Sequence, residues 1–416
     1  MANIVFTGIG LISPAGTGPG PVLDAMAEGS HFFDREQPDK RSLHPAFPWP
    51  EASLAQPDVP WPEGGSWADI KKYANMSAHQ AVAVARMAIE ASGGPADEAS
   101  GQRCGCVVAS GNRADELGPL MGRLGVMAQT DPRPLAKLLY DEVPDYSYLR
   151  GIPCQIGQFI CLASGYRGSN VAAYGEAGAS GLGALAFAAR MLHSEELDRV
   201  IVVAAGIPLP PAMLVALDRH EPLGTEALPG RGPFDTGRAG TLMGHGAVAI
   251  VMETDEVARQ RGAPRIAALR GCESINATSR DQALALATRM ALEEAGESPG
   301  LWWAHGAGSV AVDKLECDVV RPHLRVPTTA SKGTIGNTFE ASGLIDIVLA
   351  AEALRRREAP PIGLLQNPDP SLGDVDFVVR ASRALREETR TALVTAVDSR
   401  AEAAGAAVIT SIGPAT

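Results

Sequence analysis

Short apolar runs alternate with longer helical stretches along the whole chain. Runs rich in Val, Ile and Ala predict strands at residues 3–10, 105–110, 171–174, 199–205, 246–253, 301–306, 392–397 and 406–412. Helical stretches are expected at 75–92, 179–193, 281–296 and 342–357, with a further one at 114–125. This alternation is typical of an α/β fold. Because the strands are apolar almost throughout, we expect sheets that are covered on both faces.

Polar stretches divide this pattern. Residues 32–66 and 129–153 are rich in proline and charge and predict excursions on the surface. The polar run 253–265 is the best candidate for a boundary between two halves. The expected organisation is therefore an N-terminal half at 1–253 and a C-terminal half at 254–416.

Composition and charge exclude several classes of function. The chain has 416 residues, 45% apolar and 20% charged, which is ordinary for a globular protein. A net charge of −12 argues against nucleic acid or an anionic membrane as a partner. No long apolar run and no signal-like N-terminus is present, so a cytoplasmic location is expected. The six cysteines form no C-x-x-C pair, and the sequence indicates neither a metal site nor a cofactor.

The most informative segment is "GSNVAAYGEAGASGLGALAFAARML", which predicts a strand, a sharp turn and a buried helix. It resembles the nucleophile turn of β-ketoacyl synthases, where a cysteine stands at the start of the helix. Four further segments resemble that family in the same order: "IVFTGIGLISPAG", "PFDTGRAGTLMGHGAVAIVME", "WWAHGAGSVAVDKLE" and "ASKGTIGNTFEASGLIDIVLAAEALRRREAPP". The resemblance implies an α/β fold of thiolase-like type, with five αβαβα layers built from two similar halves.

The residues that carry the family's chemistry are only partly present. Gly178 stands where the resemblance places the cysteine, although a tight turn that needs glycine is a second interpretation. His305 matches the first of two imidazoles, and Asn337 replaces the second. Lys332 matches a lysine of the family, and His245 stands where a glutamate usually balances that lysine. These five positions form the expected degenerate pocket.

Charge balance in that pocket gives two further expectations. His245 is expected to face Lys332, which leaves buried charge without compensation. Glu340 either pairs with Lys332 or lies exposed in solvent. The glycine- and phenylalanine-rich loop that supplies an oxyanion-hole amide in the family reads "VDSRAEAAG" here. The sequence therefore predicts a preserved scaffold around a centre that does not condense acyl chains.

Partner surfaces follow from the same resemblance. Ketosynthases dimerise through the strand before the nucleophile turn, here 169–174, which ends at Tyr174. Tunnel or interface candidates lie in 111–140, where ordinary packing is the alternative: Leu117, Leu120, Met121 and Leu124. Lys71 and Lys72 are candidates for docking an acidic acyl carrier protein, and solvated surface is the alternative.

The interpretation that accounts for most of these features is a chain length factor. This is the silent subunit that forms a heterodimer with an active ketosynthase and shapes the acyl tunnel in type II polyketide or polyene-like biosynthesis. The carrier is expected to dock mainly on the active partner. One alternative is an enzyme repurposed to act without cysteine, using His305, Asn337, His245, Glu176 and Arg400. Another is a homodimeric scaffold.

Overall fold

The structure is a computed structural model of the whole chain. It describes residues 3–34, 49–54, 61–63, 66–110, 125–127, 129, 131–142, 147–150, 152, 154–174, 178–206, 211–398 and 402–412. Among these residues, no helix has both the length and the apolar character needed to span a bilayer.

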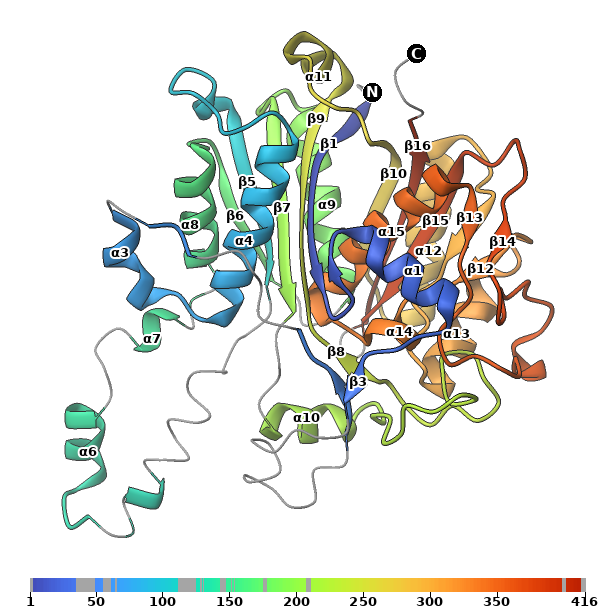
Figure 1. Cartoon of the computed structure of the whole chain (residues 1–416), viewed down its shortest axis with the longest axis horizontal. Helices are drawn as coiled ribbons and strands as arrows, with labels where there is room; N and C mark the ends of the chain where they lie inside the picture. The colour runs from blue at the N-terminus through green and yellow to red at the C-terminus, as the bar shows by residue number, and fades with distance from the viewer. Residues whose placement is uncertain are drawn as a thin grey trace.

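One large sheet runs through the molecule (Figure 1). Its strands stand in the order β12 (Thr328–Thr329), β11 (Leu301–Trp303), β15 (Thr391–Val397), β16 (Ala403–Ser411), β10 (Ala267–Asn276), β1 (Ile4–Ser13), β9 (Gly246–Thr254), β7 (Arg199–Gly206), β5 (Cys104–Ser110) and β6 (Asn170–Tyr174). A short strand, β2 (Gly16–Thr17), pairs with β1. Small separate sheets are formed by β3 (Phe33–Asp34), β4 (Glu51–Ala52) and β8 (Met243–Gly244), and by β13 (Glu358–Ala359) and β14 (Arg383–Ala384).

The large sheet is built from the same plan twice. In each half, the five principal strands can be numbered from first to fifth in sequence order. Across the sheet, from its edge to its middle, they then lie in the order third, second, fourth, fifth and first. The pairings match as well, since β5 is parallel to β6 and β7, and β11 is parallel to β12 and β15. The fourth and fifth strands of each half are antiparallel, as are the fifth and first. β1 and β10 join the halves by an antiparallel pairing.

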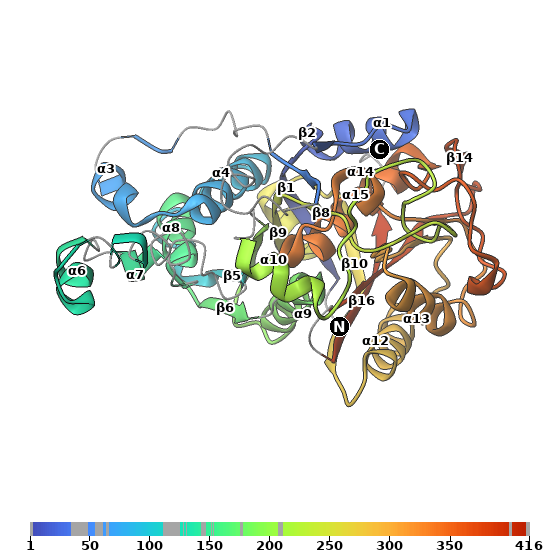
Figure 2. The same cartoon turned by 90° about the horizontal axis from the view of Figure 1, so that it is seen from below.

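Helices cover this sheet in layers (Figures 1 and 2). The N-terminal half carries α4 (Met76–Ala91) and α8 (Cys154–Ser164) outside, and the C-terminal half carries α12 (Arg280–Ala295) and α13 (Val310–Val320) outside. Between the halves lie α9 (Gly178–His193) and α15 (Ser342–Arg356), which contact each other. The order of layers is therefore αβαβα, the thiolase-like architecture that the sequence predicted.

The remaining elements are short. They are α1 (Pro19–Glu28), α3 (Ser66–Ile70), η1 (Lys71–Tyr73), η2 (Gly101–Arg103), α6 (Leu135–Glu142), α7 (Ser147–Arg150), α10 (Pro211–Asp218), α11 (Asp255–Arg261), α14 (Lys332–Ile335), η3 (Phe339–Ala341) and η4 (Pro370–Leu372). The predicted division after residue 253 falls at the end of β9, just before α11. It stays a prediction.

Burial explains why the principal strands are apolar along their whole length. β5, β7 and β15 are buried at every residue, because helices pack on both of their faces. Helix ends follow ordinary capping chemistry, since Asn75 accepts a hydrogen bond from the Ala78 amide at α4 and Ser279 caps α12. The predicted helix at 114–125 lies almost entirely outside the described residues, with only residue 125 described.

Candidate functional site

Gly178 is the first residue of α9, at the centre of the molecule. A Cβ atom built on Gly178 would lie 3.3 Å from Cε1 and 3.5 Å from Nδ1 of His305, and 3.7 Å from Cβ of Ala396. All three neighbours are side-chain atoms, so a close approach of backbone does not explain this glycine. The interpretation as a turn that needs glycine stays untested, because residues 175–177 lie outside the described part of the chain. The structure places position 178 against His305, as the resemblance implied.

Close backbone contact does occur one turn further along α9. A Cβ on Gly181 would lie 2.7 Å from the carbonyl oxygen of Glu340, and one on Gly343 would lie 2.6 Å from that of Gly178. Side chains are excluded at such distances, so Gly181 and Gly343 let the starts of α9 and α15 approach each other. This contact brings the two central helices, one from each half, to the same point.

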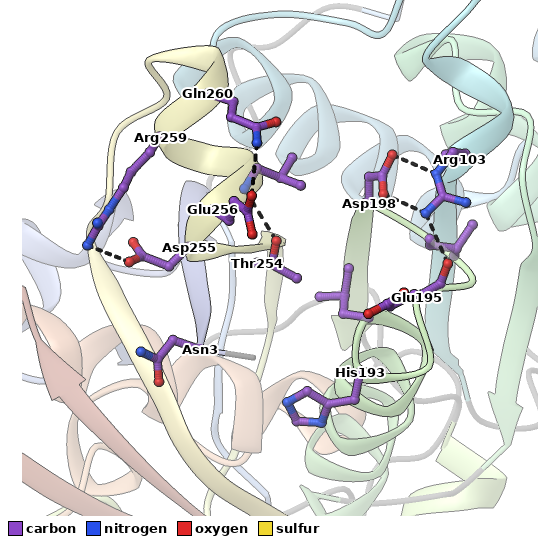
Figure 3. Close-up of a pocket in the computed structure, with 13 residues that line it drawn as sticks. Asn3, Arg103, His193, Glu195, Asp198, Thr254, Asp255, Glu256, Arg259 and Gln260 are labelled. Carbon is purple, nitrogen blue, oxygen red and sulfur yellow. Dashed lines mark hydrogen bonds and ion pairs between the residues drawn. The ribbon is translucent and has the colours of Figure 1, made fainter. Parts of the chain in front are cut away.

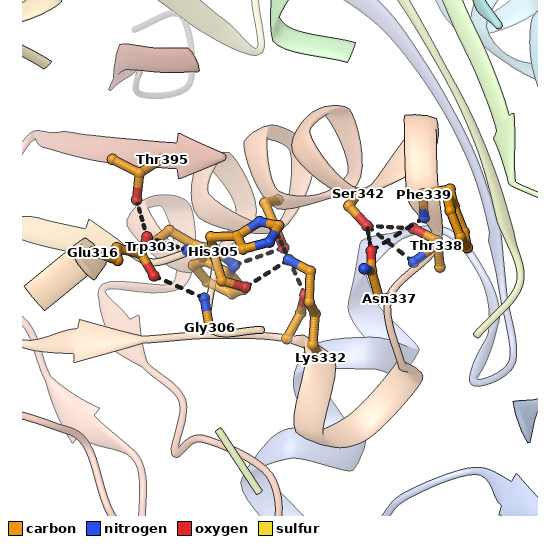
Figure 4. A network of polar contacts seen from close by, with 12 residues as sticks. Trp303, His305, Gly306, Glu316, Lys332, Asn337, Thr338, Phe339, Ser342 and Thr395 are labelled. Carbon is orange, nitrogen blue, oxygen red and sulfur yellow. Dashed lines mark hydrogen bonds and ion pairs between the residues drawn. The ribbon is translucent and has the colours of Figure 1, made fainter. Parts of the chain in front are cut away.

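His305 follows β11 and is held through its backbone (Figure 4). The carboxylate of Glu316, on α13, accepts hydrogen bonds from the amides of His305 at 2.6 Å and Gly306 at 3.0 Å. The Thr395 hydroxyl donates to the same carboxylate at 2.6 Å. Burial raises the pKa of Glu316, and these hydrogen bonds oppose that rise. Sequence reasoning missed Glu316, although the spacing Asp-x-x-Glu after the histidine was a usable signal.

A buried lysine supports the same loop (Figure 4). Nζ of Lys332 donates to the carbonyl oxygen of His305 at 2.6 Å and lies 3.5 Å from the carboxylate of Asp346. That carboxylate also accepts hydrogen bonds from the indole of Trp303 at 2.9 Å and the hydroxyl of Ser331 at 2.6 Å. Burial raises the pKa of Asp346, while Lys332 and the two hydrogen bonds lower it. The cation is thus compensated inside the protein.

This pairing corrects two expectations about charge. Lys332 pairs with Asp346, an acid to which the sequence analysis gave no role. His245 lies 3.3 Å from the carboxylate of Glu51, and both of these residues are buried. Glu340 is also buried, so the interpretation as an exposed residue is wrong. Asp346, the partner of Lys332 that the sequence analysis missed, is the one acid in the apolar run "GLIDIVLAA". Such a pattern indicates a buried and paired charge.

The imidazole of His305 is almost completely buried. Burial lowers its pKa well below 6.5, and the nearby charges of Lys332 and Arg280 lower it further. The ring is therefore neutral near pH 7. Its Nδ1 atom has no hydrogen-bond partner among the described residues. A neutral imidazole with one nitrogen unused can donate or accept a hydrogen bond, but it offers no positive charge.

Asn337, which takes the place of the second imidazole, is engaged locally. Its side-chain oxygen accepts hydrogen bonds from the amide of Phe339 at 3.2 Å and the hydroxyl of Ser342 at 2.8 Å. These bonds shape the turn that leads into α15, where Phe339 has a φ angle of 52°. Figure 4 shows this group beside the His305 and Lys332 group. Asn337 therefore lies at the predicted site and fixes the start of a helix.

A second buried ion pair anchors the loop that follows His305. Asp313 accepts hydrogen bonds from the amides of Phe234 at 2.8 Å and Gly308 at 3.0 Å, and lies 3.3 Å from Nε of Arg238. Burial raises the pKa of Asp313 to about 7, although the hydrogen bond from Phe234 and the charge of Arg238 oppose the rise. The framework of the site therefore contains several buried acids whose protonation is perturbed.

The predicted dimer strand, β6, lies at one end of the large sheet. It pairs on one side with β5, and residues 171–173 are only half-buried. Exposed apolar side chains flank it, with Leu162 on α8 50% exposed and Phe187 on α9 39% exposed. Tyr174 ends the strand, but its side chain lies outside the described part. The tunnel candidates Leu117, Leu120, Met121 and Leu124 also lie outside it, as do Glu176 and Arg400.

Lys71 and Lys72 lie together on η1 and are both exposed. Nζ of Lys72 stands 5.1 Å from the ring centre of Tyr73, and Arg150 donates a hydrogen bond to the Lys72 carbonyl at 2.7 Å. Neither lysine forms an ion pair in the described ranges. Sequence reasoning missed Arg150, which α7 brings beside the lysines from more than seventy residues away. The three cations form one basic group.

The opposite end of α9 borders a cleft of about 900 Å³ (Figure 3). Its walls carry two ion pairs, Arg103 with Asp198 at 2.7 Å and Arg259 with Asp255 at 2.7 Å. The cleft contains none of the predicted site residues. It is therefore separate from the centre around Gly178.

Comparison with known proteins agrees with this geometry. The family model for the β-ketoacyl synthase N-terminal domain matches residues 1–258, and that for the C-terminal domain matches residues 267–365. The chain belongs to the β-ketoacyl synthase family.

Two relatives are the paired subunits of one system. The chain is 25% identical over 410 residues to the tetracenomycin polyketide synthase ketoacyl synthase alpha subunit of Streptomyces glaucescens, covering 93% of this chain and 92% of that protein. It is 32% identical over 224 residues to the beta subunit from the same organism, covering 51% of this chain and 54% of that protein.

Solved structures show the same fold. The ishigamide ketosynthase/chain length factor matches with a TM-score of 0.82 at 20% identity, covering 99% of this chain and all of that one. A type II polyketide synthase acyl-carrier protein in complex with its ketosynthase, bound to the hexaketide, matches with a TM-score of 0.83 at 21% identity and the same coverage.

Proposed function

We propose that this chain is a non-condensing ketosynthase-like subunit that pairs with a cysteine-bearing ketosynthase and shapes its acyl-chain tunnel. The observation on which this proposal rests is that Gly178 begins α9 and presents no side chain to His305. The role is that of a chain length factor in type II polyketide or related biosynthesis. Relatives named as alpha and beta subunits of a polyketide synthase support such a pairing.

The chemistry of condensation requires a nucleophile that this site does not offer. A thiolate is favoured at a helix N-terminus by the unpaired amides and the helix dipole. Gly178 leaves that position without a sulfur, and Asn337 uses its oxygen on its own turn. His305 remains, but as a neutral ring. One imidazole without a nucleophile or a cationic partner is insufficient to form and attack a thioester.

The preserved parts of the molecule suit a structural role. The Lys332–Asp346 pair, and the hydrogen bonds from the His305 and Gly306 amides to Glu316, keep the loop around His305 ordered. Among the described residues, no strand pairs with the outer edge of β6, and its apolar side chains at 171–173 are half-buried, which is the form of edge that accepts a strand from another chain. We propose that the strand of the active ketosynthase adds there.

The carrier protein is proposed to dock mainly on the active partner. Lys71 and Lys72, with Arg150 beside them, would supply a secondary contact for an acidic carrier. The alternative of an enzyme repurposed to act without cysteine has less support. His245 is paired with Glu51, Asn337 bonds within its own turn, and burial makes His305 a poor base.

Co-expression with a cysteine-bearing ketosynthase of a type II polyketide system tests the proposal. We expect a 1:1 heterodimer by size-exclusion chromatography with light scattering. After incubation with an acyl donor, mass spectrometry should find the acyl group on the partner alone. A stable homodimer that ignores this ketosynthase would contradict the proposal. An acyl adduct on this chain between residues 174 and 182 would contradict it as well.

A further inference from the structure

A pocket of about 450 Å³ lies in the C-terminal half, at the amino ends of three parallel strands. Residues 297–300 lead into β11, residues 325–327 lead into β12, and residues 383–391 run from β14 to the start of β15. His305 follows the opposite, carboxyl end of β11. The length of that strand therefore separates this pocket from the centre around Gly178.

One wall of the pocket carries arginine at every third or fourth position. The segment 380–390 reads "RASRALREETR", which places arginines at 380, 383, 386 and 390. The last three of these line the pocket, together with Arg325 from the loop before β12. Such a gathering of cations contrasts with the net charge of −12 of the whole chain. The function proposed above does not use it.

The small sheet of β13 and β14 adds a further cation to this wall. The two strands pair so that Glu358 lies opposite Ala384, and the amide of Leu385 donates to the carbonyl of Arg357 at 2.9 Å. The guanidinium of Arg357 in turn donates to the carbonyl of Arg386 at 2.8 Å. The register of these strands therefore brings the end of α15 against the arginine-bearing segment.

Two of the three acids that line the pocket already have cationic partners. Nη1 of Arg383 lies 2.6 Å from each carboxylate oxygen of Asp376. Glu297 lies 3.2 Å from Nε of Arg270, a residue outside the pocket lining. The third acid, Glu388, forms no ion pair within the described ranges. One carboxylate is thus left to balance the remaining arginines.

Those arginines are compensated weakly or not at all. Arg386 and Arg390 are exposed and form no ion pair in the part of the chain that the structure describes. Arg325 lies 3.7 Å from Asp374, but the two side chains are 81% and 89% exposed, so solvent screens this pair. The three guanidinium groups outnumber the single carboxylate of Glu388. The pocket therefore attracts an anion that carries more than one negative charge.

The chemistry of arginine and the size of the pocket narrow the class of anion. A planar guanidinium donates two parallel hydrogen bonds to phosphate oxygens, and a phosphate group brings up to two charges where a carboxylate brings one. Small-molecule sites usually enclose about 300–1,000 Å³, so the volume suits more than a bare inorganic ion. Apolar lining for an organic part is supplied by Pro299, Val326, Pro327 and Leu385.

We propose that Arg325, Arg386 and Arg390 bind the phosphate groups of a small organic phosphate, of the class of a nucleoside diphosphate. The organic part would lie against the apolar side chains of Val326 and Pro327. This inference goes beyond the proposed function and does not depend on it, because the pocket and the centre lie at opposite ends of β11.

Three probes separate the phosphate from the organic part. ADP, inorganic pyrophosphate and adenosine are titrated into the purified full-length chain by calorimetry, at constant ionic strength and without divalent metal. We expect ADP to bind about ten-fold or more tightly than adenosine, and more tightly than pyrophosphate. Equal binding of ADP and adenosine, or no saturable binding of ADP, would overturn the proposal. Pyrophosphate that binds as tightly as ADP would overturn the assignment of an organic ligand.

Variants at exposed positions locate the site. The double variant Arg386→Met with Arg390→Met should weaken ADP binding about ten-fold or more, because both phosphate contacts are lost. Arg380→Met is the matched control, since Arg380 is exposed on the same segment but does not line the pocket. Equal losses in the control and in Arg386→Met alone would show an effect of net charge and overturn the assignment. Thermal unfolding checks that each variant folds.

A variant of opposite sign sharpens the test. Glu388→Gln removes the lining acid that has no cationic partner among the described residues, so ADP should bind more tightly. Weaker binding in this variant would contradict the assigned balance of charge. Pairing with a ketosynthase is measured separately, so loss of the phosphate site would leave the subunit role standing.

Discussion

The two halves of this chain repeat one strand order but end it differently. The third strand of the C-terminal half, β12, has two residues and both are buried. The corresponding strand of the N-terminal half, β6, has five residues, and residues 171–173 of it are only half-buried. Short, buried edges resist pairing with other chains, whereas long apolar edges invite it. Within the part of the chain that the structure describes, the same strand order thus ends in a short, buried edge strand in one half and a longer, partly exposed one in the other.

The centre of the molecule shows the same contrast. The C-terminal half supplies the loop that carries His305, the Lys332–Asp346 pair and Glu316, which accepts hydrogen bonds from that loop. The N-terminal half supplies the start of α9, where Gly178 offers only backbone. The N-terminal half therefore carries the surface that we propose for assembly, and the C-terminal half provides an ordered interior.

The most severe test of the ordered interior is loss of one buried charge. Asp346→Ala should destabilise the fold by about 3–5 kcal/mol, because Lys332 would remain buried without its anion. Chemical denaturation followed by circular dichroism measures this change. The double variant with Lys332→Met should recover part of the loss. A change below about 1 kcal/mol would mean that the pair does not support the C-terminal half.

The pH dependence of stability should also arise largely in the C-terminal half. Burial raises the pKa of Asp313 from 3.8 to about 7, so the folded state holds a proton that the unfolded state has released. The stability from this proton is full below about pH 4 and is lost as the pH rises to about 7, at a cost of roughly 2–4 kcal/mol.

Denaturation midpoints between pH 4 and 8 measure this slope. Asp313→Asn should flatten it, whereas Asp318→Asn, at an exposed acid of the same helix, should leave it unchanged. An unchanged slope in Asp313→Asn would show that another group controls the pH response.

Proline substitutions compare the two edges directly. Ala172→Pro, on β6, should weaken assembly at least ten-fold, about 1.4 kcal/mol, with little effect on the fold. Thr328→Pro, on β12, removes an amide that donates to the Asp376 carbonyl at 2.8 Å and should destabilise the fold. Analytical ultracentrifugation and thermal unfolding separate the two effects. Assembly unaffected by Ala172→Pro would remove β6 from the interface.

The sequence was most informative where a local pattern has a single structural solution. α9 and α15 were predicted to within one residue at each end, because long apolar helices with small residues have no competing interpretation. β10 was missed, since its charged and polar residues, such as Arg270 and Glu273, interrupt the apolar run. α8 and α13 were also missed, each following a glycine- or proline-containing loop.

The sequence predicted most of the residues that line the site, but not which of them contact each other. Gly178, His305, Lys332 and Asn337 meet at the centre, as the resemblance implied. The partners Asp346 and Glu316 escaped, because their contacts depend on helices that approach from elsewhere in the chain. For the same reason, His245 was expected to face Lys332, whereas it lies beside Glu51. The repeat of strand order is also invisible in the sequence, since it resides in the pairing of strands.

The pairing of β1 with β10 joins the strands of the two halves into one continuous sheet across the middle of the protein. A gene that duplicated such a unit would inherit two copies of each position, one of them free to change. Alteration of the start of α9 would then leave its counterpart, the start of α15, untouched. A change confined to the start of α9 leaves the contacts of the C-terminal half in place, so the chain can lose a side chain at its centre and still fold.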